Sequence, residues 1–380
     1  MKILIAPDSF KGSLTATEAA AAMAAGARAV YPDADIVSVP LADGGEGTVD
    51  AWLRACGGRR ENRQVTGPLG ESMTAAFGIL ADGVTAVVET AAASGLTLVP
   101  PARRNPLDTT TYGTGELIHH AIDSGMRRLV VGLGGSATND GGAGALQALG
   151  VTFLGSAGVA LLSPITGGMI DSIDALKVNV KPTANLEVVI ASDVMNPLTG
   201  PTGASAVFGP QKGATPDMVA HLDAALTKLA SIYRRDLGVD ILNVPGGGAA
   251  GGLGAALMAF FNARAQSGID LILDAAHFDE AAADADYIIT GEGSIDSQTL
   301  SGKAVAGVVN RCHKIGNASV IAIGGVVDMS VAVELERAGV TAIEAASPPG
   351  MRVEEAMARA SELVEAATER ALSSLQEIRV

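Results

Sequence analysis

Six polar loops in this chain carry residue types that can transfer a phosphoryl group. They span residues 8–13, 43–47, 134–142, 192–197, 246–251 and 291–296, and most of them follow short apolar runs. Phosphoryl transfer needs backbone N–H groups and cations around the phosphate oxygens, carboxylates that hold magnesium, and a base that orients the accepting hydroxyl. The glycines, lysines and carboxylates of these loops supply all of these groups.

The chain lacks the residue patterns that are typical of acyl-transfer enzymes and of zinc enzymes. None of the six loops contains a histidine, so a serine–histidine pair is not expected. The five histidines show no HxxxH spacing, which argues against a zinc hydrolase. Lys303 follows Gly302, but Ser297 stands five residues before that glycine, so the spacing of a P-loop is absent.

Two of the loops are rich in glycine. Residues 246–251 match the pattern GxGxxG and run into an apolar helix, although a lone match is weak and such glycines also permit close packing. Residues 134–142 combine Ser136, Thr138 and Asn139 with four glycines at an expected strand-to-helix turn. Because the N-terminus of a helix favours anions, the second loop is the stronger candidate for phosphate binding.

Charged residues in the loops are candidates for charge neutralisation and metal binding. Lys11 lies close to the end of the first expected strand. The carboxylates in candidate loops are Asp8, Asp43, Glu46, Asp193, Glu292 and Asp296. The competing interpretation is that each is a solvated surface charge, as most isolated acids are. Lys212, in a turn at residues 208–213, is by the same argument expected to be a surface cation.

The elements that position these loops follow from the apolar pattern. Residues 2–6 predict a buried strand, and Thr15 with Glu18 has the spacing of a capping box before a helix to about residue 30. Strand and helix patterns alternate again after residue 285, whereas residues 59–89 favour β-hairpins. This order predicts a parallel sheet built by both chain ends, interrupted by an inserted domain.

Further strands are expected at residues 129–133, 186–191 and 287–290, each before a polar loop. A helix is predicted over 216–237, because one face carries the apolar stripe of Leu222, Leu226, Leu229 and Tyr233. In open α/β sheets ligands gather at the carboxyl ends of the strands. The polar loops are therefore expected at a ligand site.

The composition excludes several function classes. A formal charge of −15 argues against a surface that binds nucleic acid, because neutralising phosphates needs a basic stripe. Cys56 and Cys312 form no CxxC pair and fit a reduced compartment. No signal-peptide core and no window of ~18 apolar residues is found, so the protein is expected to be cytoplasmic and independent of membranes.

Seven ordered blocks carry a resemblance to a known family. They are APDSFKGSLTA at 6–16, LADGGEGTVDA at 41–51, GLGGSATNDGG at 132–142, SDVMNPLTGPTGAS at 192–205, FGPQKGA at 208–214, PGGGAAGGLGAAL at 245–257 and TGEGSIDSQTLSGKAVAGV at 290–308. With these blocks the chain resembles, over essentially its whole length, the bacterial glycerate kinases of type 1. That class includes enzymes of the glucarate and glyoxylate pathways.

The resemblance implies an α/β fold with a Rossmann-like domain formed by residues 1–60 and 285–380. Residues 61–284 are expected to form an inserted α/β domain, with the active-site cleft between the two. The implied reaction transfers the γ-phosphate of ATP, with magnesium, to D-glycerate in the catabolism of glycerate and related organic acids. The expected products are 2-phosphoglycerate and ADP, although the sequence leaves the 3-phosphate open. A monomer or a homodimer is expected.

Roles within the site are hypotheses from loop position. Asp193 is expected to orient or deprotonate the glycerate hydroxyl, because it follows the apolar strand at 186–191. Lys11 and Asp8 complete the catalytic set. Glu46, Glu292 and Asp296 are expected to hold magnesium. The residues expected to bind substrate or nucleotide are Ser9, Asp43, Gly44, Gly45, Gly134, Gly135, Ser136, Thr138, Asn139, Lys212, Gly247, Gly248 and Lys303.

Two other functions compete with the kinase. The GxGxxG match suggests a nicotinamide-dependent dehydrogenase, but no clear strand precedes Gly246 and no catalytic histidine loop is found. A sensor that binds a nucleotide or a sugar acid without turnover would use the same fold. The number of loops with carboxylates and lysines favours an enzyme.

Overall fold

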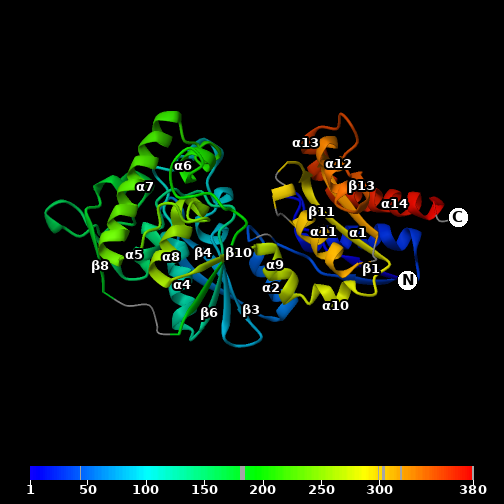
Figure 1. Ribbon diagram of the computed structural model, residues 1–380, viewed down its shortest axis with the longest axis horizontal. Coiled ribbons are helices and arrows are strands. Elements are labelled where there is room, and N and C mark those ends of the chain that lie inside the picture. The colour runs from blue at the N-terminus through cyan, green and yellow to red at the C-terminus, as the bar shows by residue number, and fades with distance from the viewer. Residues whose placement is uncertain (43, 180–184, 298, 302–303, 317–318, 379–380) are drawn as a thin grey trace. The chain divides into compact units, whose positions relative to one another are not determined.

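The computed structural model describes residues 1–42, 44–179, 185–297, 299–301, 304–316 and 319–378 (Figure 1). Asp43 and Lys303, two of the expected binding residues, lie outside the described residues. The chain divides into two compact units: Met1–Asp43 with Ile269–Val380, called here the terminal unit, and Gly44–Gly268, called the central unit. Each unit has its own sheet and core, which agrees with the predicted α/β class.

The terminal unit contains a five-stranded sheet in which every pairing is parallel. Its strands, in spatial order, are β13 (Val340–Ala345), β12 (Ser319–Val327), β11 (Tyr287–Ile295), β1 (Lys2–Ile5) and β2 (Asp35–Ser38). The chain runs from β1 to β2 on one side and from β11 to β12 on the other. The order therefore reverses between β1 and β11, which is where open α/β sheets bind ligands.

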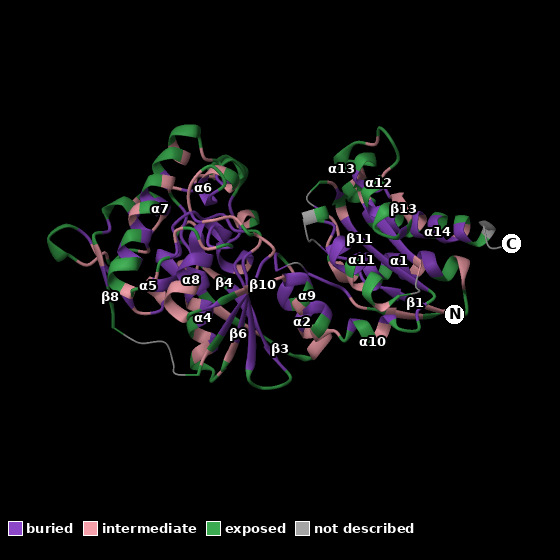
Figure 2. Cartoon of the chain, in the orientation of Figure 1, coloured by how far each residue is buried: buried purple, intermediate pink, exposed green. Residues whose placement is uncertain are grey.

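Helices cover this sheet. α1 (Ala16–Val30) packs against α14 (Ala360–Ile378) over Ile3, Ile5 and Ile289. A Cβ on Gly26 of α1 would lie 2.3 Å from the Glu365 backbone oxygen, so glycine permits this close approach. The alternate strand residues Leu4 and Ile288 are buried as well, which shows that both faces are covered (Figure 2). The remaining helices of this unit are α9 (Gly268–Ala275), α10 (Phe278–Ala282), α11 (Ala304–Ile315), α12 (Met329–Arg337) and α13 (Val353–Ala358).

Several predicted elements of the terminal unit are confirmed. β1 covers most of the strand predicted at 2–6, and α1 ends at Val30. The capping box is present, since the Thr15 hydroxyl accepts from the Glu18 amide at 3.2 Å and Glu18 accepts from the Thr15 amide at 2.9 Å.

The central unit contains a six-stranded mixed sheet. Its spatial order is β10 (Arg264–Gln266), β9 (Glu187–Ala191), β6 (Arg128–Gly132), β5 (Thr85–Glu89), β4 (Ser72–Leu80) and β3 (Gly58–Thr66). β3 and β4 pair antiparallel, as do β4 and β5, which confirms the hairpins predicted over 59–89. The pairs β5–β6, β6–β9 and β9–β10 are parallel, so the carboxyl ends of four strands share one edge.

The main helices of the central unit are α2 (Thr48–Cys56), α4 (Tyr112–Asp123), α5 (Ala143–Ala148), α7 (Pro216–Leu237) and α8 (Leu253–Phe261). The stripe predicted on α7 is confirmed, because Leu222, Leu226, Leu229 and Tyr233 are all buried. Short elements complete the unit: α3 (Ala91–Ser94), α6 (Ala204–Phe208) and the antiparallel pair β7 (Val151–Leu154) and β8 (Ala175–Val178).

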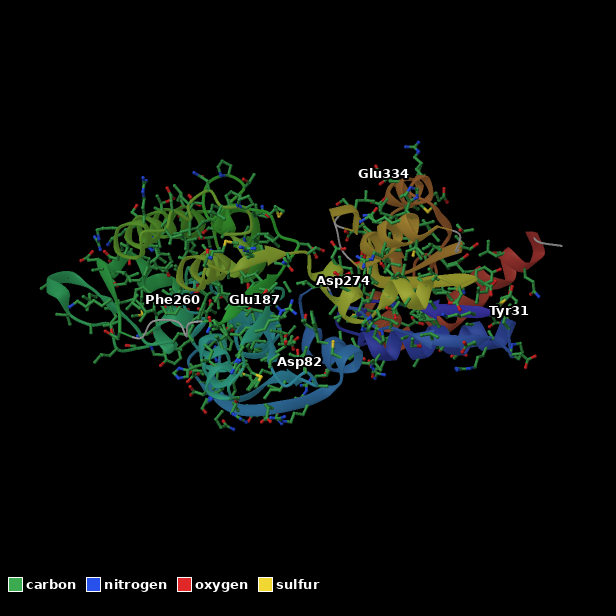
Figure 3. The ribbon with its side chains drawn as sticks, turned by 60° about the horizontal axis from the view of Figure 1, so that its bottom comes forward. Tyr31, Asp82, Glu187, Phe260, Asp274 and Glu334 are labelled. Atoms are coloured by element: carbon green, nitrogen blue, oxygen red, sulfur yellow. The ribbon has the colours of Figure 1, made fainter. Side chains whose placement is uncertain are left out.

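The limits of the two units differ from the expected boundaries at residues 60 and 284. α2 packs on β4 and β5, where a Cβ on Gly78 would lie 3.3 Å from the Val49 side chain. It therefore joins the central unit. α9 belongs with the terminal unit, because its Ile269 contacts Gly307 of α11 and its Asp274, labelled in Figure 3, pairs with Arg311. Helix packing across a sequence boundary is not visible in an apolar pattern. In the described ranges, no helix is both long and apolar enough to cross a membrane.

Candidate active site

The loop after β1 is fixed to β11 at the point where the strand order reverses. The Asp8 amide donates to the Gly291 backbone oxygen at 2.9 Å, and the Ser9 amide donates to the Asp8 carboxylate at 2.6 Å. Asp8 is buried, while Ser9 is partly exposed. These bonds hold the Asp8 carboxylate at the carboxyl edge of the sheet.

Lys11 stands on a tight turn that follows. The Phe10 amide donates to the Leu14 oxygen at 2.8 Å, and the Ser13 amide donates back to the Phe10 oxygen at 2.9 Å. Gly12 closes this turn with a φ of +81°, a conformation that favours glycine. The Lys11 side chain is exposed.

Glu292 and Asp296 are linked through one threonine. The Thr299 hydroxyl donates to Glu292 at 2.7 Å and accepts from the Asp296 amide at 3.0 Å. The Ser294 hydroxyl donates to the Asp296 carboxylate at 3.1 Å. Glu292 is buried and Asp296 is partly exposed. The two expected metal ligands of this unit thus belong to one hydrogen-bonded network at the end of β11.

The described residues can be compared with what a magnesium site requires. Within the parts of the chain that the structure describes, no three His, Cys, Asp or Glu side chains form a group that could hold a metal. Glu46, the third expected ligand, is an exposed residue of the central unit. Magnesium commonly uses only one or two carboxylates and completes its coordination with water and substrate phosphates. Asp8 and Glu292, which line one pocket, fit that donor set.

That pocket has a volume of about 300 Å³. Its polar residues include Asp8, Ser9 and Lys11 of the loop after β1, and Glu292 and Ser294 near the end of β11. It is also lined by apolar residues between β12 and α14. The terminal unit therefore brings together two polar segments from widely separated parts of the sequence.

In the central unit, glycines allow the loops after β6 and before α2 to touch. The Gly134 amide donates to the Gly44 oxygen at 3.0 Å. A Cβ on Gly134 would lie 2.5 Å from the Gly45 Cα, and one on Gly132 would lie 2.5 Å from the Gly44 oxygen. Close backbone packing accounts for these glycines, whether or not a ligand also contacts them.

Lys212 is buried, so the expectation of a surface cation is wrong. Its side chain is 3% exposed, and its ammonium donates to the Ser136 hydroxyl at 2.9 Å and to the Thr138 backbone oxygen at 2.6 Å. Burial lowers the pKa of Lys212 to about 7, although the nearby charge of Asp140 acts in the opposite direction. Lys212 therefore ties the 208–213 turn to the glycine-rich loop after β6.

Asp140, which the sequence argument passed over, is the centre of a buried network. Its carboxylate accepts from the Thr111 amide at 2.8 Å, the Thr111 hydroxyl at 2.7 Å and the Gly142 amide at 3.0 Å. Burial raises the pKa of Asp140, while these hydrogen bonds oppose the rise. Its position beside Asn139 in the 134–142 loop is the sequence feature that could have identified it as a candidate residue.

Asn139 presents a buried acceptor. Its side-chain amide donates to the Ser205 hydroxyl at 3.0 Å. Its Oδ1 is buried and has no hydrogen-bond partner in the described structure. A buried acceptor of this kind costs free energy unless a ligand or water satisfies it. Asn139 Oδ1 is therefore available to accept a hydrogen bond from a ligand or from water.

The GxGxxG segment packs against these loops. A Cβ on Gly248 would lie 2.3 Å from the Pro197 oxygen, and one on Gly251 would lie 2.0 Å from the Thr138 oxygen. Gly247 donates its amide to the Val244 oxygen at 3.0 Å and so belongs to a local turn. The fully described stretch 185–268 has no strand between Ala191 and Arg264, so the strand that a dinucleotide fingerprint requires is absent.

Asp193 follows the carboxyl end of β9. The strand ends at Ala191, and the Ser192 amide donates to the Gln266 oxygen at 3.0 Å, which continues the pairing with β10. The Val194 amide then donates to the Ser192 hydroxyl at 3.2 Å. The Asp193 side chain is partly exposed at the edge shared by the Gly134 loop.

Comparison with known proteins decides the family. The family model described as "Glycerate kinase family" matches residues 3–376. The chain belongs to the glycerate kinase family. Membership makes the protein a kinase, and ATP is the phosphate donor of such an enzyme.

Similar proteins cover nearly the whole chain. "Glycerate kinase" of Bacillus subtilis is 47% identical over 367 residues, which is 96% of this chain and 95% of that protein. "Glycerate 2-kinase" of Escherichia coli is 49% identical over 327 residues, which is 86% of this chain and 85% of that protein. The crystal structure of a protein from Salmonella typhimurium LT2 assigned as glycerate kinase 2 matches with a TM-score of 0.84 and 47% identity, covering 100% of this chain and 99% of that one.

Within this kinase, a second buried acid also escaped sequence reasoning. Glu89, the last residue of β5, is only 9% exposed and accepts from the Val49 amide of α2 at 3.2 Å. Burial raises the pKa of Glu89 to about 7. Glu89 ends a fully buried strand, and that position was the only signal in the sequence.

Proposed function

We propose that this enzyme transfers the γ-phosphate of ATP to the 2-hydroxyl of D-glycerate and releases 2-phosphoglycerate and ADP. The observation that carries the proposal is the similarity over 86% of the chain to the E. coli relative named glycerate 2-kinase. The polar clusters of both units support it, because they hold the cations, carboxylates and backbone donors that phosphoryl transfer uses.

In the proposed reaction Asp193 acts as the base. The glycerate 2-hydroxyl gives its proton to the Asp193 carboxylate as its oxygen forms a bond to the γ-phosphorus, and the bond from that phosphorus to the β–γ bridging oxygen breaks. ADP leaves with the bridging oxygen. Support comes from the position of Asp193 after β9, half-buried and beside loops that carry polar donors.

The buried cluster of the central unit suits the acceptor substrate. The Lys212 ammonium has three N–H hydrogens. It donates two of them, to the Ser136 hydroxyl and to the Thr138 backbone oxygen. Ser136 accepts from Lys212, so its own hydrogen can be donated to a glycerate carboxylate oxygen. The buried Oδ1 of Asn139 is a suitable acceptor for a glycerate hydroxyl.

The cluster of the terminal unit suits the triphosphate. Lys11 would neutralise phosphate charge, and the partly exposed Ser9 would donate its hydroxyl hydrogen to a phosphate oxygen. Asp8 and Glu292 would hold magnesium, which when bound neutralises charge on the phosphate oxygens. Asp296 would then keep the Glu292 loop in place through Thr299.

The proposed setting is the cytoplasm, with the enzyme as a monomer or a homodimer. The reduced cysteines Cys56 and Cys312 support a reducing compartment. Light scattering during gel filtration would measure the mass in solution, and a mass above that of a dimer would contradict the proposal.

The test of the function is ATP consumption with D-glycerate and magnesium, followed by addition of enolase. Enolase accepts 2-phosphoglycerate directly, so immediate formation of phosphoenolpyruvate is expected. Turnover that enolase cannot follow would identify the 3-phosphate and overturn the regiochemistry. L-glycerate serves as the matched control for stereochemistry. If no hydroxy acid causes ATP consumption, the proposed substrate class is wrong.

A further inference from the structure

We propose that the pocket of the terminal unit binds the adenine base of ATP against the apolar wall formed by Met351, Val353, Met357, Ala360 and Leu363. This inference rests on the proposed function, since it assumes that ATP is the donor. It adds a location for the nucleoside to the phosphate contacts proposed for Lys11 and Ser9.

The pocket has two chemically different sides. Asp8, Ser9 and Lys11 line it from the loop after β1, and the residues of the apolar wall line it from the segment between β13 and the start of α14. Its volume of about 300 Å³ reaches the range of ~300–1,000 Å³ typical of small-molecule sites, whose walls are largely apolar with a few polar groups. The pocket thus offers separate surfaces to a ring and to charged groups.

The position in the sheet supports a ligand site. The pocket is lined by the loop after β1 and by the end of β11, between which the strand order reverses. Nucleotides in open α/β sheets lie outside the carboxyl ends of strands at such a point. With the phosphates toward Lys11, the base of a nucleotide would lie on the apolar wall.

The chemistry of the two substrates indicates which of them contacts the apolar wall. Glycerate is a three-carbon hydroxy acid with no apolar surface to cover five apolar residues. The purine ring is the only large flat apolar group of the two substrates, and methionine sulfur makes favourable contacts with aromatic rings. Met357 already bridges the two sides, since a Cβ on Gly12 of the Lys11 turn would lie 2.8 Å from the Met357 Cε.

A neighbouring pocket is a poorer candidate. It has a volume of about 750 Å³ and shares Val326, Ser347 and Met351 with the first. Glu336 and Glu344 line it, and Arg370 pairs with Glu344 at 3.5 Å. The first pocket is favoured because it brings Lys11 together with Asp8 and Glu292, the pair proposed to hold magnesium, at the carboxyl ends of the strands.

The experiment places a charge on the wall at two exposed positions. Met357 is 40% exposed and Val353 is 67% exposed, so Met357→Glu and Val353→Glu should fold, which thermal unfolding checks. Val333→Glu on α12 is the matched control, because Val333 is 43% exposed and lines neither pocket. Calorimetry with ADP and with adenosine measures binding without turnover.

Both wall variants should bind ADP and adenosine at least about 10-fold more weakly, while Val333→Glu should bind like the unmodified enzyme. In steady-state assays the KM for ATP should rise and the KM for D-glycerate should stay the same. Unchanged ADP affinity in folded Met357→Glu and Val353→Glu would overturn the proposal. If the unmodified enzyme binds ADP but does not phosphorylate glycerate, the proposed acceptor is wrong. The adenine site is then judged by the binding data for the wall variants alone.

Discussion

The buried ammonium of Lys212 donates a 2.9 Å hydrogen bond to the Ser136 hydroxyl, 76 residues away in sequence. The same ammonium donates to the Thr138 backbone at 2.6 Å. Through this lysine, the turn at 208–213 holds the glycine-rich loop after β6 in place. A buried cation therefore contacts the loop that is proposed to bind glycerate.

Lys212→Met should lower turnover and change how stability depends on pH. The pKa of Lys212 is lowered from 10.5 to about 7 in the folded protein, so the unfolded chain binds the extra proton between these values. The contribution of Lys212 to stability is therefore present above pH 10.5 and is lost as the pH falls to 7. The slope it adds is at most about 1.4 kcal/mol per pH unit.

Urea unfolding of both proteins at several pH values between 7 and 9 checks this slope. Lys314→Met is the control, because Lys314 is an exposed residue of α11. Equal slopes in Lys212→Met and the unmodified protein would mean that Lys212 stays protonated throughout this range.

Glu89→Gln should stabilise the protein at pH 8. The pKa of Glu89 is raised from 4.5 to about 7, so its contribution to stability is present below pH 4.5 and is lost as the pH rises through 7. Gln can still accept from the Val49 amide without carrying a buried charge. The free energy of unfolding should rise by about 3 kcal/mol at pH 8 and change little at pH 4.5.

The matched control for Glu89 is Glu187→Gln at the start of β9, a residue labelled in Figure 3, whose side chain is 64% exposed. It should alter stability by less than about 0.5 kcal/mol at either pH. A destabilised Glu89→Gln protein at pH 8 would show instead that the ionised carboxylate is needed at the N-terminus of α2.

Asp193→Asn should remove most turnover and preserve the fold. Loss of a general base typically lowers the rate by about 10²–10⁴-fold, whereas the amide keeps the shape of the side chain. Steady-state kinetics with D-glycerate and circular dichroism measure the two effects. Asp240→Asn, at an exposed position of the same unit, is the control, and near-normal turnover in Asp193→Asn would remove the base assignment.

Lys11→Ala should raise the KM for ATP by about 10-fold without changing thermal stability, because an exposed charge contributes to ligand binding more than to folding. Lys314→Ala provides a control of equal charge change. Calorimetry with ADP complements the kinetics. If ATP and ADP bind Lys11→Ala as they bind the unmodified enzyme, Lys11 has no place in phosphate recognition.

Local patterns predicted much of the fold because they depend on neighbouring residues. The capping box of Thr15 and Glu18, the stripe of α7 and the hairpins of β3–β5 are all short-range features. The boundaries of the two units were harder to predict from the sequence, because α2 and α9 are assigned to a unit by the elements they pack against. Sheet order was likewise not determined by the pattern of any single strand.

The sequence by itself determined the family and the loops that hold the polar residues, because seven ordered blocks and the chemistry of their side chains are properties of the chain. Only the tertiary structure decided how those residues behave. Burial lowers the pKa of Lys212, leaves Asn139 Oδ1 without a hydrogen-bond partner among the described residues and puts Asp140 at the centre of a network. Desolvation and hydrogen bonding depend on surroundings from distant segments, so these properties exist only once the loops have come together.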